Sequence, residues 1–137
     1  VQRLARGNPQ VRLLGLLGDR EQCADLLRAA DVFVLPSTAE GLSLSLLEAM
    51  ASGCALIATD AGDDGAAVGD AGIVIPANPL QPALSRALEQ LHDDDQLRVR
   101  LGAAARARAV RGYAMGSRID DLLDAYAAIT SDVAAVA

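Results

Sequence analysis

The sequence contains no lysine and no tryptophan, and it has only two tyrosines and one phenylalanine among 137 residues. The core must therefore be aliphatic, built mainly from Ala, Leu and Val. All twelve basic residues are arginines, they form no basic run, and the formal net charge is -6. Because nucleic-acid binding usually needs a basic patch, the composition excludes DNA and RNA as partners.

Cysteines and long apolar runs are equally scarce. Cys23 and Cys54 lack the Cys-x-x-Cys or Cys/His spacing of a zinc site or a disulfide framework, which predicts two small buried residues in a reducing compartment. No apolar stretch approaches the roughly 18 residues that span a bilayer, and residues 1–8 lack a signal-peptide pattern. We expect a soluble, cytoplasmic protein.

Short apolar runs alternate with helical patterns along the chain. The runs have consecutive apolar positions, as in strands that a parallel sheet buries on both faces, and they lie at Val11–Leu14, Asp31–Leu35, Ala55–Thr59 and Gly72–Ile75. The alternation predicts an α/β fold with a Rossmann-like, doubly wound parallel sheet. Four strands are few for that architecture, and residues 1–6 resemble the end of a helix, so we expect a chain truncated at its N-terminus.

Helix signals lie between and after these strands. Asp19 with Gln22 offers a capping box, and Gly53 stands at a C′ position that ends a helix over Leu44–Ser52. Asn78 is expected to cap a later helix. The remaining helical patterns cover Leu80–Leu91, Asp94–Val110 and Ser117–Ile129. We expect one partial domain over residues 1–130 and a disordered tail over 131–137.

The loop after Asp31–Leu35 is where a site is expected, because ligands of open α/β sheets bind beyond the carboxyl ends of the strands. Glu40 lies in this loop, Gly41 lets the backbone approach a ligand, and Ser43 can cap the next helix. The free N–H groups of its first turn favour an anion by about 0.3–1 kcal/mol. Glu48 follows in an apolar segment, where a buried carboxylate needs donors such as ribose hydroxyls.

The residues around the two acids form a longer pattern. In order, they read ADVFVLPS from Ala30, EGLS from Glu40, LEAMASG from Leu47 and ATDAG from Ala58. With its Glu-x7-Glu motif, this pattern resembles the family 4 glycosyltransferases of the GT-B fold over about residues 11–126. The resemblance implies transfer of a hexose from a UDP-, GDP- or ADP-sugar with retention at the anomeric carbon, without an obligatory metal or another cofactor.

The resemblance also assigns roles to single residues. Glu40 matches the acid that binds the donor sugar near the reacting carbon, the catalytic position, and Glu48 matches the acid that binds the ribose. The other donor-binding positions that it implies are Gly41, Leu42, Ser43, Leu44 and Ser45 at the sugar and phosphate, and Gly15 and Leu16 in the loop beside the base. It further implies that the acceptor domain is missing and that this part alone is inactive.

Departures from the family pattern leave alternatives open. After Glu40 and Gly41, this chain has Leu42-Ser43 where many relatives have Phe-Gly. Asp63-Asp64 adds negative charge near the expected diphosphate position. The Gly-Arg and Lys-Gly loop that supplies the family's diphosphate-binding basic residues is absent. A non-catalytic nucleotide-sugar-binding module or a degenerate structural domain is therefore the alternative. The acceptor, whether sugar, lipid or small molecule, is open, and so is a peripheral contact with the inner face of the membrane.

Two other features have a plain structural explanation. His92 is the single histidine, but it follows a predicted helix and precedes an acidic run, far from the strand ends, which indicates a surface residue. A cluster of arginines is interpreted as an ordinary solvated helix face, because acids precede it and its spacing is helical. The cluster comprises Arg98, Arg100, Arg106, Arg108 and Arg111.

Overall fold

The chain folds around a three-stranded parallel sheet. The structure, a computed structural model, describes residues 7–135. The strands are β1 (Val32–Leu35), β2 (Ala55–Thr59) and β3 (Ile73–Ile75), in that order across the sheet. All residues of the central β2 are buried, which explains its consecutive apolar positions. These three strands confirm three of the four that the sequence predicts.

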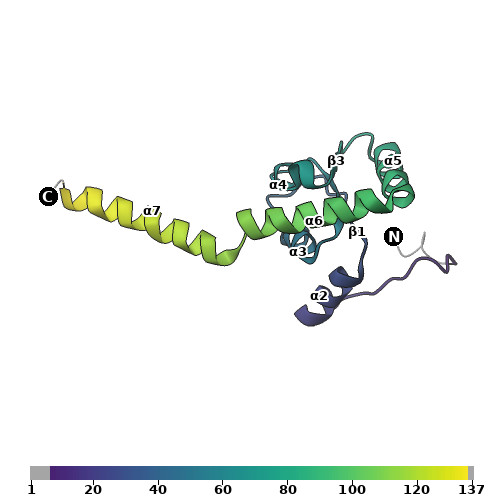
Figure 1. Cartoon of the computed structure of the whole chain (residues 1–137), viewed down its shortest axis with the longest axis horizontal. Helices are drawn as coiled ribbons and strands as arrows, with labels where there is room; N and C mark the ends of the chain where they lie inside the picture. The colour runs from purple at the N-terminus through teal and green to yellow at the C-terminus, as the bar shows by residue number, and fades with distance from the viewer. Residues whose placement is uncertain (1–6, 136–137) are drawn as a thin grey trace.

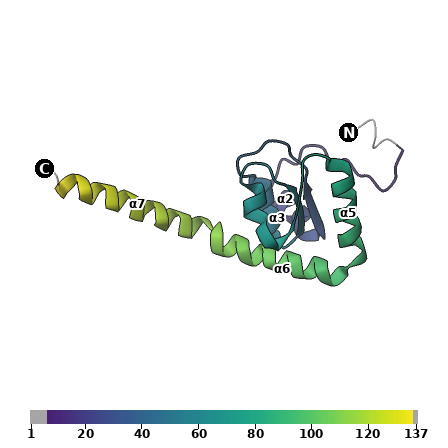
Figure 2. The same cartoon turned by 90° about the horizontal axis from the view of Figure 1, so that it is seen from above.

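Helices cover both faces of the sheet (Figures 1 and 2), and the predicted Rossmann-like α/β architecture is confirmed. The helices are α2 (Arg20–Ala29), α3 (Leu44–Ser52), α4 (Asp64–Val68), the 3-10 helix η1 (Gly69–Ala71), α5 (Leu80–Asp93), α6 (Asp95–Gly112) and α7 (Met115–Ala135). Alternate residues of β2 face opposite sides of the sheet. Leu56 and Ala58 pack under α3, α4 and α6, whereas Ala55 and Ile57 pack under α5 and the start of α6.

The predicted strand Val11–Leu14 is wrong. This segment has irregular backbone, and the side chains of Val11, Leu13 and Leu14 are 46%, 51% and 43% exposed. A strand needs a neighbour to complete its hydrogen-bond ladder, and among the described residues β1 pairs with β2 alone. The predicted helix end at residues 1–6 lies outside the described residues.

Several helix ends can be compared with the local sequence signals. Asp19 caps α2 by accepting the backbone N–H two residues further on at 2.9 Å. Gly53 ends α3 in the left-handed conformation, at a φ of 84°, as predicted. The predicted cap at Asn78 is wrong, because Pro79 takes the N-cap position of α5 and no side chain caps that helix.

Two arginines of α6 tie the helical layer together. Arg106 donates to the Ala51 carbonyl at 2.7 Å, and Arg108 donates to the Ala67 carbonyl at 2.7 Å. These carbonyls belong to the last turns of α3 and α4, where no intrahelical donor remains. Both side chains therefore cap other helices. Arg106 does so while exposed, as predicted for a solvated face, whereas Arg108 is partly buried, so the prediction is wrong for Arg108.

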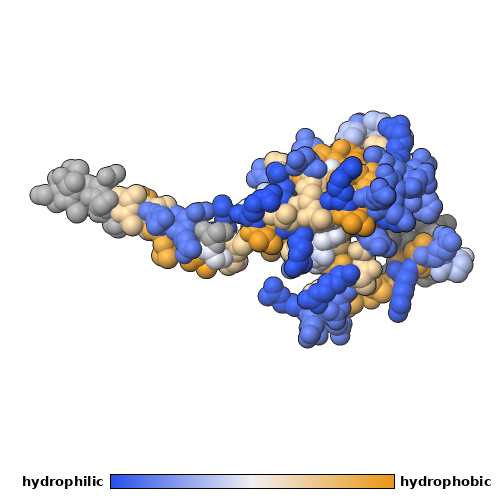
Figure 3. All heavy atoms as spheres, in the orientation of Figure 1, coloured by the Kyte–Doolittle hydropathy of each residue, from blue (hydrophilic) through white to orange (hydrophobic). Residues whose placement is uncertain are grey.

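The last helix, α7, projects from the body of the molecule (Figures 1 and 2). Hydrophobic atoms gather along one side of it (Figure 3), and its exposed apolar residues are Met115, Ile119, Leu122, Leu123, Tyr126 and Ile129. The helix runs to Ala135, into the range 131–137 for which a disordered tail is predicted. Within residues 7–135, no helix is long and apolar enough to cross a membrane.

Candidate functional site

The candidate site lies at the edge of the sheet where β1 and β2 end. The two strands are parallel, so the loops that follow them, 36–43 and 60–63, leave the same edge. Because α2 leads into β1 and α3 leads out of it, the first turns of both helices lie at this edge as well. The fold thereby brings the predicted acid Glu40 next to residues about twenty positions further along the chain.

The two loops are interlocked through their backbones. Gly62 has a φ of 56°, and a Cβ on it would lie 2.8 Å from the Glu40 carbonyl carbon and overlap the neighbouring carbonyl oxygens. Asp63 donates its backbone N–H to the Gly41 carbonyl at 2.7 Å. The hydroxyl of Thr59, buried at the end of β2, also donates to a carbonyl of the β1 loop. The backbone that carries Glu40 is thus fixed by its neighbour.

The side chain of Glu40 is exposed and oriented. Ser37 donates its hydroxyl to Oε1 of Glu40 at 2.8 Å. The carboxylate is accessible from solvent, so it can accept further hydrogen bonds from the hydroxyls of a ligand. The structure therefore presents the predicted catalytic acid at the carboxyl edge of the sheet.

The start of α3 differs from the prediction in one respect. Ser43 is the N-cap residue, but its side chain caps no backbone group, because its hydroxyl is paired with the Ser45 hydroxyl at 2.9 Å. The Ser43 N–H instead donates to Oδ1 of Asp64 at 2.8 Å. The N–H groups of Leu44 and Ser45 are in the first turn and have no intrahelical acceptor, so by helix geometry they point out of the helix at this edge of the sheet.

Asp64 is the one charged residue in the core of the described chain. It is 1% exposed, whereas its neighbour Asp63 is exposed. The two acids were expected to act alike, as negative charges that repel a diphosphate. The structure separates them, because only Asp64 is turned inward onto the Ser43 N–H.

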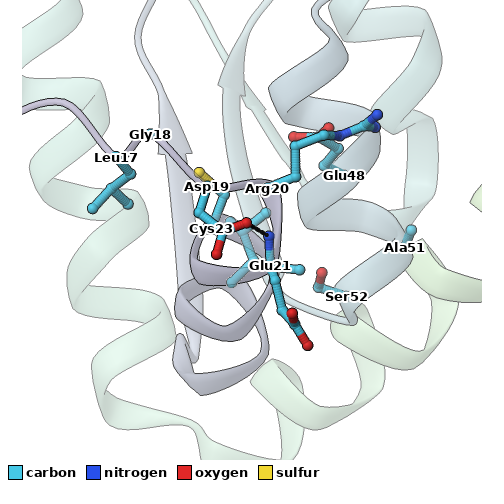
Figure 4. A pocket seen from close by; sticks show the side chains of 11 residues that line it. Leu17, Gly18, Asp19, Arg20, Glu21, Cys23, Glu48, Ala51 and Ser52 are labelled. Atoms are coloured by element: carbon cyan, nitrogen blue, oxygen red, sulfur yellow. Dashed lines mark hydrogen bonds between the residues drawn. The ribbon is translucent and has the colours of Figure 1, made fainter.

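A pocket of about 470 Å³ lies between α2 and α3. Figure 4 shows Arg20, from the start of α2, alongside Glu48 of α3 at its rim. The inner wall is apolar and includes Cys23, Leu27 and Ala51. Glu48 is exposed, so the expected cost of burying its carboxylate does not arise, and its oxygens are available to a ligand.

The predicted base-binding loop, residues 15–19, reaches this pocket through its later residues. Leu17 and Gly18 line the pocket. Gly15 and Leu16 do not line it, and the Leu16 side chain is 96% exposed. In the part of the chain that the structure describes, no group of three or more His, Cys, Asp or Glu side chains is placed to hold a metal ion.

His92 lies away from the site, as predicted. It is exposed in the last turn of α5 and borders a hollow together with Asp31, just before the start of β1. That position is at the opposite end of the strand from Glu40. The histidine therefore has no part in the chemistry at the carboxyl edge.

Comparison with protein families decides the assignment. A family model described as glycosyl transferases group 1 matches residues 1–94, more than half of the chain. The chain belongs to the group 1 glycosyl transferases. The match includes both acids, the start of α3 and the loop after β2, so the candidate site lies within the matched range.

Characterised glycosyltransferases are similar to this group 1 chain over most of its length. A UDP-Gal:alpha-D-GlcNAc-diphosphoundecaprenol alpha-1,3-galactosyltransferase from Escherichia coli is 34% identical over 87% of the chain. A D-inositol 3-phosphate glycosyltransferase from Kineococcus radiotolerans is 34% identical over 85%. The chain spans 30% and 28% of the length of these two relatives.

Solved structures confirm the GT-B fold of this glycosyl transferase chain. Sucrose-phosphate synthase from Thermosynechococcus elongatus matches 96% of the chain with a TM-score of 0.83 at 25% identity, over 34% of its own length. The C-terminal domain of a group 1 glycosyl transferase from Francisella tularensis matches 82% of the chain, over 58% of its own length, with a TM-score of 0.72 at 30% identity. HepE of Anabaena, solved in complex with UDP, has the same fold, with a TM-score of 0.81 at 22% identity over 93% of this chain and 34% of its own.

Two residues of the candidate site escaped the sequence-based prediction. Arg20 follows the helix cap Asp19, and nothing in the local pattern indicates that it lies beside Glu48. Asp64 was recognised only as an added charge, because the sequence does not show that its side chain faces Ser43, 21 positions earlier.

Proposed function

We propose that this chain is the donor-binding part of a retaining glycosyltransferase of family 4, which transfers a hexose from a nucleotide-diphosphate sugar to an acceptor. The observation that carries the proposal is the meeting of three features at one edge of the sheet. They are the oriented Glu40 carboxylate, the open first turn of α3 and the pocket bordered by Glu48.

The geometry suggests how a donor is held. The diphosphate lies over the first turn of α3, where the N–H groups of Leu44 and Ser45 and the helix dipole favour negative charge by about 0.3–1 kcal/mol. Glu40 then accepts hydrogen bonds from the sugar hydroxyls, and Glu48 accepts them from the ribose. The base reaches the apolar wall of the pocket between α2 and α3.

A helix N-terminus of this strength rarely holds a diphosphate by itself, so a cation is needed. Arg20 is our candidate, since it lies at the pocket rim beside Glu48, one helical turn past Leu44 (Figure 4). Arginine binds phosphate through several N–H groups at once. In the transfer step, these donors stabilise the charge that develops on the departing diphosphate, within a cleft closed by an acceptor domain.

The relatives support a nucleotide-sugar donor. One bears the name of a galactosyltransferase that uses UDP-Gal, and a protein of the same fold was solved with UDP. We propose UDP-, GDP- or ADP-sugars as candidate donors, without a metal cofactor. We also propose a cytoplasmic enzyme whose acceptor is a sugar, a lipid at the inner face of the membrane, or a small molecule.

Calorimetric titration of UDP, GDP and ADP into the full-length protein tests donor binding. We expect one nucleotide to bind, and Glu48→Gln to weaken it about tenfold or more, because hydrogen bonds to a charged group are worth about 1.5–3 kcal/mol. Glu89→Gln is the matched control, an exposed acid near the end of α5, at the opposite edge of the sheet. The donor assignment fails if no nucleotide binds, or if both variants weaken binding equally.

Turnover separates catalysis from binding. Glu40→Gln is expected to lower the rate of sugar transfer while leaving the Kd of the nucleoside diphosphate unchanged, because that product lacks the sugar. A non-catalytic nucleotide-sugar-binding module is the second candidate, favoured by the negative charge of Asp63 and Asp64 near α3. Tight donor binding by the full-length protein without any transfer or donor hydrolysis supports that candidate.

A further inference from the structure

The contact between Asp64 and the start of α3 joins the two loops of the site. Oδ1 of Asp64 accepts the Ser43 N–H at 2.8 Å, and the Asp64 side chain is 1% exposed. Burying a carboxylate is costly unless it accepts hydrogen bonds. The bond from the Ser43 N–H therefore offsets the cost of burying Asp64 and also holds the backbone of Ser43 in place. Ser43 immediately precedes the N–H groups of Leu44 and Ser45, which face the site.

The surroundings leave the Asp64 carboxylate little freedom to turn away. Asp64 opens α4, which packs against the buried β2. At the next position, Gly65, a Cβ would overlap a carboxylate oxygen of Asp60. On the other side, the Asp63 N–H is bonded to the Gly41 carbonyl. The turn that carries Asp64 is thus held on both flanks, opposite the start of α3.

We propose that Asp64 is a positioning residue that fixes the start of α3 and, through its charge, limits how tightly the site binds the phosphates of a donor. The assignment of a phosphate ligand rests on the proposed function, whereas the hydrogen bond between Asp64 and Ser43 does not. The carboxylate already accepts the Ser43 N–H. A bound diphosphate then relies on Leu44 and Ser45 and lies near a fixed negative charge.

Three variants separate the bond from the charge. Asp64→Asn removes the charge but keeps an oxygen that can accept the Ser43 N–H. Asp64→Ala removes both. Asp63→Asn is the matched control, because it removes the same charge one residue away, from a side chain that is exposed. Each variant is made in the full-length protein for titration and in the present chain for amide hydrogen exchange.

Amide exchange of Ser43 in the ligand-free chain tests the positioning role. We expect Asp64→Ala to speed exchange at Ser43 about tenfold or more relative to the wild type, because its acceptor is lost. Asp64→Asn and Asp63→Asn are expected to keep the protection. If Asp64→Ala does not fold, Asp64→Asn is measured instead, with the buried amides of β2 as the internal reference. Faster exchange at Ser43 than at those amides would show that the bond from the Ser43 N–H is weakened. Unchanged protection of Ser43 would support a bond that the asparagine oxygen retains.

Titration tests the charge. Each of UDP, GDP and ADP is compared with its nucleoside, because only the diphosphate feels the charge of Asp64. We expect Asp64→Asn to tighten diphosphate binding about two- to fivefold, the range of a single interaction at a helix N-terminus, with nucleoside binding unchanged. Asp63→Asn is expected to change it less, since that side chain does not face Ser43.

Several results would overturn the inference. Unchanged Ser43 exchange in Asp64→Ala would remove the positioning role. An equal gain in diphosphate affinity for Asp64→Asn and Asp63→Asn, or no gain for either, would remove the specific role of the Asp64 charge. If wild-type protein binds neither diphosphates nor nucleosides, the proposed function fails and the charge role with it, whereas the exchange data still decide whether Asp64 positions α3.

Discussion

Replacing Gly62 by alanine perturbs the junction between the two site loops directly. Gly62 has a φ of 56°, in the left-handed region, and an added Cβ would overlap the carbonyl oxygens of Glu40 and Gly41. Both obstacles are backbone atoms, which cannot rotate away as a flexible side chain would. The substitution must therefore strain residue 62 and displace the loop that carries Glu40.

The magnitude follows from these two effects. An alanine in the left-handed region costs about 1–2 kcal/mol, and forcing an extra methyl group against packed atoms costs about 1–3 kcal/mol. We expect Gly62→Ala to lower the free energy of unfolding by about 2–5 kcal/mol, a large fraction of the total for a single domain. Gly53→Ala is the control: Gly53 has a φ of 84°, but its nearest contact, the Gly102 carbonyl oxygen, lies at an ordinary 3.9 Å.

Denaturant unfolding at 25 °C measures both variants. Gly53→Ala is expected to show the conformational cost alone, about 1–2 kcal/mol. The difference between the variants then reports the clash with the Glu40 loop, and titration of Gly62→Ala with a nucleotide sugar is expected to show weakened donor binding. Equal destabilisation by the two substitutions would refute the inference that the loops are interlocked through Gly62.

Other substitutions test the packing of α6 and the buried thiol. A Cβ on Gly102 would overlap the Gly53 carbonyl oxygen. Gly102→Ala should therefore lower the free energy of unfolding by about 1–3 kcal/mol, measured by thermal or denaturant unfolding. Gly112→Ala is the control and should not destabilise the fold, because a Cβ at Gly112 meets open space. Burial raises the pKa of the Cys54 thiol; a backbone hydrogen bond offsets part of this rise, and the charge of Asp31 adds a smaller rise of its own. Because the folded chain then holds a proton that the unfolded chain releases, stability should fall as the pH rises above about 8.5, and unfolding of Cys54→Ala should show a shallower fall over the same range.

Local patterns were sufficient where the signal lies within one element. Consecutive apolar residues located β2, since a strand covered on both faces has no polar side. The left-handed Gly53 located the end of α3. The motif residues Glu40 and Glu48 were found in the same way, and the structure places both, exposed, on the carboxyl side of β1.

Patterns failed where the outcome depends on a neighbour. Val11–Leu14 has the composition of a strand, but strand formation needs a hydrogen-bonding partner, and none pairs with it among the described residues. Arg108 has the spacing of a solvated face, yet it is partly buried and caps the carbonyl end of α4. In each case, the deciding contact joins segments that the sequence keeps apart.

The sequence by itself located the three strands, the longer helices and the two acids of the candidate site, because periodicity, glycine positions and motif spacing are properties of short segments. Only the tertiary structure decided that Gly62 locks the Glu40 loop, that Arg20 borders the pocket with Glu48, and that Asp64 is buried against Ser43. These contacts arise from the parallel pairing of β1 and β2, which brings the ends of two distant strands to one edge of the sheet.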